Sequence, residues 1–259
     1  MSTDVVNVLS MNGLGELPRG WLRVVGAFRH ALVLSVLPTG TSPSHQRLFS
    51  IVTSMKPLVP YGLKADVREF SEVAAGTEVV FDGERLRFPV FELDCRDAVE
   101  TDLRASPVYR EDPEGLQRCL AAARSLLRVK APWEGVRSID PALDEESLVG
   151  LLMGKGPGLT PSGDDFLCGC LWSYAVAGDA RFDRLAEVVA AHAGETTPVS
   201  RGFLMSAASG SFVEALKMAE GEPMEGLGWL LAQGSSSGAD VLSGVVHGMS
   251  SFTNRDVFS

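Results

Sequence analysis

The chain has 259 residues, 45% of them hydrophobic, and a formal net charge of −10 at pH 7. Its length and composition are typical of a globular protein with one large domain or two small ones. The acidic balance and the lack of any lysine and arginine cluster argue against nucleic acid as a partner.

No apolar run approaches the ~20 residues that span a membrane, and the first ten residues lack the features of a secretion signal. The four cysteines form no CxxC pair, and the four histidines show no ligand spacing. We therefore expect no zinc site, no membrane partner, and a cytoplasmic protein with reduced thiols.

Residues 1–110 are predicted to form a β-rich domain. The pair Asp82-Gly83 is typical of a type I′ hairpin turn. Prolines at 38, 43, 57 and 60 divide the region into short pieces, which favours a small antiparallel sheet or barrel over βαβ units. The strands we expect are residues 31–37, 48–53, 77–81 and 84–90.

Residues 111–259 are predicted to form an all-helical domain, which makes the chain an α+β protein. The pairs Asp112-Pro113, Asp140-Pro141 and Thr197-Pro198 each place a capping residue before a proline, as is typical of helix starts. The helices we expect run over about 113–127, 141–153, 166–177, 179–193, 198–218, 224–232 and 240–250.

A glycine-rich loop, GKGPGLTPSGDD at residues 154–165, opens the third of these helices. It matches neither the phosphate-binding loop of nucleotide hydrolases nor the dinucleotide-binding fingerprint. Glycines let a ligand approach the main chain, and a helix start offers unpaired N–H groups. The loop is therefore our first candidate for a ligand site.

This loop has an echo 75 residues later. Residues 235–244 repeat the pattern of residues 160–169: hydroxyl, any, Ser, Gly, any, Asp, any, Leu, any, Gly. Gly169 and Gly244 fall at the same place inside two helices, where glycine costs about 1 kcal/mol relative to alanine. We predict that these helices cross closely there, so that both loops face one pocket across a pseudo-two-fold axis.

Two interpretations of the repeat remain open. In the first, Ser162 with Asp165, and Ser237 with Asp240, are capping boxes that need no ligand. In the second, the serines and the amides that follow them also bind an oxyanion. The candidate binding residues are then Gly158, Thr160, Ser162, Gly163, Arg201, Ser237, Gly238 and Asp240.

Asp164 and Asp165 are the catalytic candidates. Asp165 is explained by the cap alone, whereas Asp164 is left to bind a Mg²⁺ ion that bridges a phosphate, or to orient or deprotonate an amine. The sequence does not choose between these roles, and the cofactor stays unknown apart from this Mg²⁺ hypothesis. Arg201, at another helix start, could pair with a carboxylate or phosphate.

The segment GKGPGLTPSGDDFLCG resembles the signature of the DUF2877 family, and GSSSGADVLSG and the Thr196-Thr197 segment are similar too. Members have been described as carboxylases. An AllH-like branch is a subunit of a bacterial oxamate carbamoyltransferase of allantoin, and hence purine, catabolism. That enzyme interconverts oxalurate and phosphate with oxamate and carbamoyl phosphate. The resemblance implies a small-anion site and assembly with other subunits, but no residue roles.

Our leading hypothesis is an enzyme subunit that handles small carboxylate or phosphate metabolites, as an oxamate carbamoyltransferase does. One alternative is a non-catalytic metabolite-binding or assembly subunit. Others are a carboxylase-like protein of unknown substrate and a structural protein with two capped helices. Whether the chain is an enzyme by itself stays open at this point.

Overall fold

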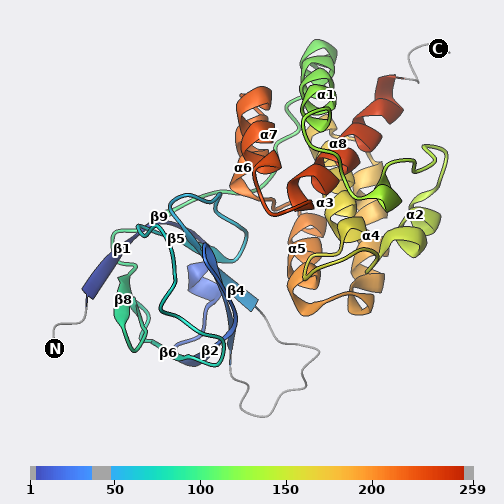
Figure 1. Cartoon of the computed structure of the whole chain (residues 1–259). Helices are drawn as coiled ribbons and strands as arrows, with labels where there is room; N and C mark the ends of the chain where they lie inside the picture. Colours follow the sequence, from blue (N-terminus) through green and yellow to red (C-terminus); the bar gives the residue numbers. More distant parts are fainter. Residues whose placement is uncertain (1–3, 37–47, 254–259) are drawn as a thin grey trace. The chain divides into compact units, whose positions relative to one another are not determined.

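The computed structural model describes residues 4–36 and 48–253. The chain divides into two compact units, Met1–Leu103 and Arg104–Ser259. The first is built of strands and the second of helices (Figure 1). The predicted α+β class, with a β-rich N-terminal part before an all-helical part, is confirmed. No helix in the described ranges is long and apolar enough to cross a membrane.

The strands of the first unit close into a barrel. Within the described residues the ring runs β5-β4-β3-β2-β6-β7-β8-β1, and β1 also pairs with β5, which closes it. Most pairs are antiparallel, but β4–β5, β1–β8 and β1–β9 are parallel. The strands are β1 (Asp4–Asn12), β2 (Gly20–Phe28), β3 (Ala31–Val36), β4 (Leu48–Thr53), β5 (Gly62–Ala65), β6 (Glu78–Phe81), β7 (Arg85–Arg87), β8 (Phe91–Asp94) and β9 (Val99–Glu100).

Side chains that alternate between the inner and outer face of each strand fill the inside of the barrel. In β2, Leu22 and Val24 are buried while Trp21 before them and Val25 after them are exposed, because successive side chains of a strand point to opposite faces. Two predicted strands, 31–37 and 48–53, are present as β3 and β4. Leu37, Pro38 and Pro43, at and after the expected end of the first, lie outside the described residues.

The hairpin at Asp82-Gly83 exists, but its predicted turn type is wrong. A type I′ turn needs positive φ at both central residues, and only Gly83 (φ 106°) has it. The Asp82 carboxylate instead accepts hydrogen bonds from the amides of Glu84 (2.9 Å) and Arg85 (2.8 Å). The expected strand 84–90 is also shorter, because the chain turns again before β8.

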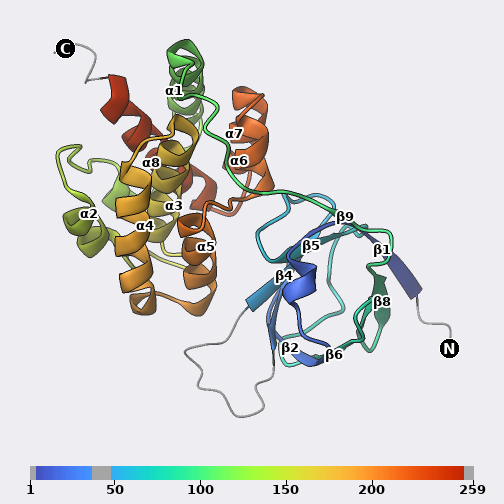
Figure 2. The same ribbon diagram turned by 180° about the vertical axis from the view of Figure 1, so that it is seen from behind.

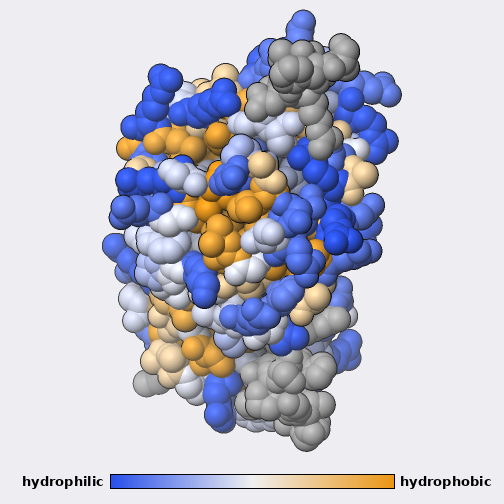
Figure 3. All heavy atoms as spheres, turned by 90° about the vertical axis from the view of Figure 1, so that its right-hand side faces the viewer, coloured by the Kyte–Doolittle hydropathy of each residue, from blue (hydrophilic) through white to orange (hydrophobic). Residues whose placement is uncertain are grey.

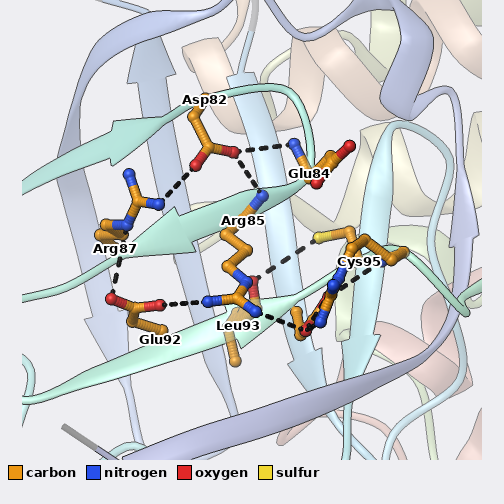
Figure 4. A network of polar contacts seen from close by, with 9 residues as sticks. Asp82, Glu84, Arg85, Arg87, Glu92, Leu93 and Cys95 are labelled. Carbon is orange, nitrogen blue, oxygen red and sulfur yellow. Dashed lines mark hydrogen bonds and ion pairs between the residues drawn. The ribbon is translucent and has the colours of Figure 1, made fainter.

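Charged pairs fix the register of β7 against β8 (Figure 4). Arg85 lies opposite Asp94 and Arg87 opposite Glu92, and the ion pairs of Arg85 with Asp94 and Glu92 are both 3.4 Å long. The hydrogen bonds from Arg96 lower the pKa of Asp94 to about 2. Such half-buried surface pairs add little stability one by one, but opposite charges across a hairpin favour one register over its alternatives.

The second unit is organised around α3 and α8, which lie at its centre (Figures 1 and 2). Nearly all of α3 is buried, including Phe166 and Trp172, as expected for a helix that is hydrophobic on all sides. The helices are α1 (Pro113–Leu127), α2 (Glu145–Leu152), α3 (Ser162–Ala177), α4 (Arg181–His192), α5 (Pro198–Ala208), α6 (Glu214–Ala219), α7 (Pro223–Leu231) and α8 (Ser237–Thr253), with short 3-10 turns at Glu134–Val136 and Ala193–Glu195.

Two of the three predicted proline-marked helix starts are confirmed. Asp112 caps α1 and Thr197 caps α5, each accepting a backbone N–H with its side chain. The start at Asp140-Pro141 is wrong, because the Asp140 carboxylate accepts the Ala142 amide (2.9 Å) in a turn and α2 is capped by Asp144. A side chain that forms a local turn competes with capping a helix.

The expected helix over 198–218 is two helices. The first, α5, ends at Ala208, and Gly210 then adopts a positive φ of 82° before α6 begins at Glu214. A left-handed glycine just after a helix is a common terminator. The apolar spacing continues across the break, which is why the sequence pattern alone did not show it.

The predicted crossing of α3 and α8 is confirmed. A methyl group placed on Gly169 would lie 2.1 Å from the carbonyl oxygen of Val241, and one on Gly244 would lie 2.0 Å from that of Phe166. Phe166 and Val241 are themselves 75 residues apart, so the two contacts are exchanged by the repeat. The helices therefore cross at their glycines with backbone against backbone, about an approximate two-fold axis.

We expect Gly169→Ala and Gly244→Ala each to destabilise the chain by about 2 kcal/mol or more, because the added methyl meets immovable backbone. The control is Gly150→Ala in α2, where the added methyl meets nothing within 4 Å. It should raise stability by up to about 1 kcal/mol through helix propensity alone. Urea unfolding of the three variants measures this. Equal effects at all three positions would contradict the close crossing.

Candidate functional site

The glycine-rich loop between α2 and α3 is held in a left-handed backbone. Gly154, Gly156 and Gly158 have φ of 68°, 111° and 94°, values that L side chains rarely adopt. Gly156 packs against the helix start, since a methyl group on it would lie 2.7 Å from the Ser162 nitrogen. Gly158 is exposed, with open space where a side chain would be. Gly154 and Gly156 thus serve the fold, and only Gly158 is free to face a ligand.

The start of α3 differs from the predicted capping box. Pro161 is the N-cap, no side chain caps the helix, and Ser162 is its first residue. The Pro161 carbonyl accepts the amides of Asp164 (2.9 Å) and Asp165 (3.1 Å). The predicted Ser162–Asp165 capping box is therefore wrong, because the chain enters the helix one residue earlier than that motif requires.

The first-turn amides are already used within the protein. Besides those two, Gly163 donates to the Lys155 carbonyl (2.8 Å). In the echo, Gly238 donates to Gln233 (3.2 Å), and the amides of the next two residues donate to Ser236 (2.8 and 2.9 Å). The two helix starts thus share one backbone pattern, and it does not direct these amides at a ligand.

Both glycines that follow the serines allow close packing. A methyl group on Gly163 would lie 2.1 Å from the Leu152 carbonyl oxygen, and one on Gly238 would lie 2.0 Å from that of Leu230. These carbonyls belong to the ends of α2 and α7, the helices that precede the two loops. The repeat therefore extends from the loops to the helices before them.

Asp164 ties three segments together. Its Oδ1 accepts the Gly154 amide (2.8 Å), and its Oδ2 accepts the hydroxyls of Ser200 (2.6 Å) and Thr196. The side chain is buried. A carboxylate has about four acceptor positions, and three of them are filled here by the loop and by the start of α5. The geometry gives no support to a Mg²⁺ or amine role for this residue.

We expect Asp164→Ala to destabilise the chain by about 3 kcal/mol, because it leaves three donors, the buried Ser200 and the half-buried Gly154 and Thr196, without an acceptor. Ser200→Ala, which removes one of the three hydrogen bonds, should cost about 1 kcal/mol. Urea unfolding measures both changes. If the two variants were equally stable, Asp164 would not be the link between the loop and α5.

Asp165 joins the two helix starts. The Ser237 hydroxyl, on the first residue of α8, donates to its Oδ2 at 2.6 Å. Burial raises the pKa of Asp165 well above its ordinary value, and the nearby carboxyl groups of Asp240 and Asp164 raise it further, against the lowering effect of hydrogen bonds from Ser237 and Thr160. The predicted convergence is confirmed for the two helix starts, and Asp165 is kept neutral over a wider pH range than an ordinary aspartate.

This pKa shift has a definite sign in stability. Below the ordinary pKa of 3.8 Asp165 is protonated whether the chain is folded or not. Above that value only the unfolded chain ionises freely, so the contribution to the free energy of unfolding falls until the folded-state pKa is passed. Asp165→Asn, which can still accept from Ser237, should therefore gain stability relative to wild type as the pH rises from 4 to 8. Melting curves across this range test it, and parallel pH profiles would contradict it.

Asp240 and Ser162 form the counterpart of the Asp165–Ser237 pair under the 75-residue repeat. Asp240 Oδ1 accepts the Trp133 amide at 2.6 Å. Asp240 Oδ2 and Ser162 Oγ are buried and have no hydrogen-bond partner. Buried polar atoms are nearly always paired. The two unpaired atoms therefore distinguish the Ser162–Asp240 pair from the Ser237–Asp165 pair.

The remaining candidates lie around this centre. Thr160 is half-buried and contributes a hydrogen bond to Asp165. Arg201 follows Ser200 in α5, and its amide donates to the Thr197 carbonyl (2.9 Å). Sequence reasoning missed Trp133, because it takes part through its backbone amide, which leaves no mark in a side-chain pattern.

No group of three or more His, Cys, Asp or Glu side chains in the described parts of the chain is placed to hold a metal ion. The four cysteines are all free thiols. Burial raises the pKa of Cys119 to about 11 and that of Cys95 to about 12. These two thiols are thus protonated at neutral pH and are poor nucleophiles.

The fold and site define an α+β protein whose helical unit carries a duplicated loop-and-helix motif with two converging helix starts. A family model described as oxamate carbamoyltransferase subunit AllH matches residues 152–249, which is consistent with an AllH-like family. The matched segment begins at the end of α2 and ends in α8, so it contains both copies of the motif. No curated protein and no solved structure matches the chain.

Proposed function

We propose that the chain is an enzyme subunit that handles small carboxylate or phosphate metabolites, in an assembly of the oxamate carbamoyltransferase type. The reaction would transfer a carbamoyl group between carbamoyl phosphate and oxamate, with oxalurate and phosphate on the other side. The observation that carries the proposal is the convergence of the α3 and α8 starts, through Ser237 and Asp165 (2.6 Å), within the segment that the family model matches.

The electrostatics of the convergence suit an anionic metabolite. Helix N-termini favour negative charge, and here two of them meet. The neutral state of Asp165 removes one repulsive charge, and Asp164 is bound by three donors. With the first-turn amides occupied, the anion would be bound by the hydroxyl of Thr160 and by Arg201, a residue type suited to carboxylate and phosphate.

The same groups would assist the transfer itself. Attack on a carbamoyl carbon places negative charge on its oxygen, and fixed donors near that oxygen stabilise the transition state. A protonated Asp165 would be one such donor, because a buried neutral carboxyl group can give a hydrogen bond. Gly158 leaves the exposed main chain of the loop bare of a side chain, whereas Gly163 and Gly238 pack against the ends of α2 and α7.

A second candidate is a non-catalytic subunit that binds the metabolite or supports assembly. It is favoured by Asp164, a catalytic candidate that the fold itself uses. Surface hydrophobicity also suits a subunit: Val129, Leu151, Leu159 and Met224 are each more than half exposed. Hydrophobic side chains gather within a hydrophilic rim on the face in Figure 3, and such patches often mark interaction sites.

Thermal unfolding with oxamate, carbamoyl phosphate or phosphate, each with and without Mg²⁺, tests the site. A ligand that binds only the folded chain adds ~2.7 kcal/mol at a hundred times its dissociation constant. We expect such a gain in wild type, a smaller gain in Ser162→Ala and Ser237→Ala, and the full gain in Ser125→Ala, an exposed serine of α1.

Stability unaffected by all of these compounds would contradict the proposed site. Turnover of carbamoyl phosphate and oxamate by the isolated chain would support the enzyme over the binding subunit. Binding without turnover, with activity restored by partner subunits but kept in the Asp165→Asn variant, would support the second candidate.

A further inference from the structure

The two hydroxyl–carboxyl pairs of the repeat are in different states. In the first pair, Ser237 donates to Asp165 at 2.6 Å. In the second pair, the equivalent atoms, Ser162 Oγ and Asp240 Oδ2, are buried without a hydrogen-bond partner. The protein thus completes one pair with its own atoms and leaves a donor and an acceptor unmet in the other.

The backbone holds the unmet acceptor in place. The Trp133 amide donates to Asp240 Oδ1 at 2.6 Å, which holds one oxygen of the carboxyl group and leaves Oδ2 as the other. Ser162 is the first residue of α3, and Gly156 packs against its nitrogen and side chain. Neither atom is free to turn away to solvent, because both residues are almost completely buried.

The chemistry of the pair selects a class of ligand. A hydroxyl can donate one hydrogen bond, and a carboxyl oxygen can accept one. A ligand group that satisfies both must present an acceptor and an N–H donor close together, as the H₂N–C=O group of a carbamoyl compound or primary carboxamide does. A phosphate or a second carboxylate presents only acceptors, and would leave Asp240 Oδ2 unpaired beside a further negative oxygen.

We propose that Ser162 and Asp240 bind the H₂N–C=O end of a small metabolite. The Ser162 hydroxyl donates to the carbonyl oxygen, and Asp240 Oδ2 accepts from the amide nitrogen. The inference rests on the proposed function, since it assumes that the convergence of α3 and α8 is the ligand site. It adds which end of the metabolite lies there and which two residues choose it. Because the loop of Gly156 covers Ser162, binding displaces part of this loop.

Oxamate and oxalate are the probes, because they have nearly the same size and differ in one amide group against one carboxylate. Calorimetry on the full chain should show that wild type binds oxamate at least about tenfold more tightly than oxalate, the difference expected for one well-placed hydrogen bond to a charged or polar group. In Asp240→Asn, Oδ1 can still accept from Trp133 while an NH₂ group replaces Oδ2. This variant should lose the preference for oxamate.

Asp183→Asn is the matched control, since it makes the same change at an exposed position on α4, and it should keep the preference. Ser162→Ala is the second variant, and it should weaken oxamate binding by about tenfold. If circular dichroism shows that Asp240→Asn does not fold, the oxamate affinity of Ser162→Ala tests the proposed binding mode in its place.

The binding data distinguish failure of the Ser162–Asp240 binding mode from failure of the proposed function. If oxamate binds and a folded Asp240→Asn keeps the wild-type preference for oxamate, the inference is overturned and the proposed function stands. If Ser162→Ala keeps the wild-type affinity for oxamate, the inference is likewise overturned, and the proposed function then rests on the weaker binding expected of Ser237→Ala. In that case the unmet pair holds a structural water only. If wild type binds neither probe at millimolar concentration, the proposed site fails and the inference fails with it.

Discussion

The backbone contact between α3 and α8 is the constraint on which the helical unit depends. Gly169 and Gly244 let the two helices cross with carbonyl oxygens where side chains would otherwise stand. A crossing this close, about seven residues from each helix start, brings the two starts near one another. The repeat of 75 residues makes the contact reciprocal, so each loop meets the other across an approximate two-fold axis.

The carboxyl groups of Asp164, Asp165 and Asp240 are buried near the helix starts. Each has a different set of hydrogen-bond partners. Asp164 is surrounded by donors from the loop and from α5. Asp165 is kept neutral by its burial, because removing a charge from water without compensation is unfavourable. Asp240 is oriented by one backbone amide. Equivalent positions in the repeat therefore have different hydrogen-bond partners.

This asymmetry connects the fold to the proposed function. A carbamoyltransferase of this type must hold molecules that are charged at one end and carry H₂N–C=O at the other. Converging helix ends suit the charged end, and an unmet hydroxyl with an unmet carboxyl oxygen suits the neutral end. The family match spans this part of the helical unit and leaves the barrel outside it.

The sequence by itself determined the local features and the repeated ones. The β-rich and helical halves and the helix starts at Asp112 and Thr197 follow from short patterns whose physical causes are local, and the crossing follows from a glycine repeated at the same place in two helices. Only the tertiary structure decided how the carboxyl groups are used. Apart from Thr160, five residues before Asp165, the partners of Asp164, Asp165 and Asp240 lie 10 to 107 residues away along the chain, and two of them are backbone amides. Such pairings, and the burial that shifts a pKa, arise only when distant segments pack together, so no local pattern encodes them.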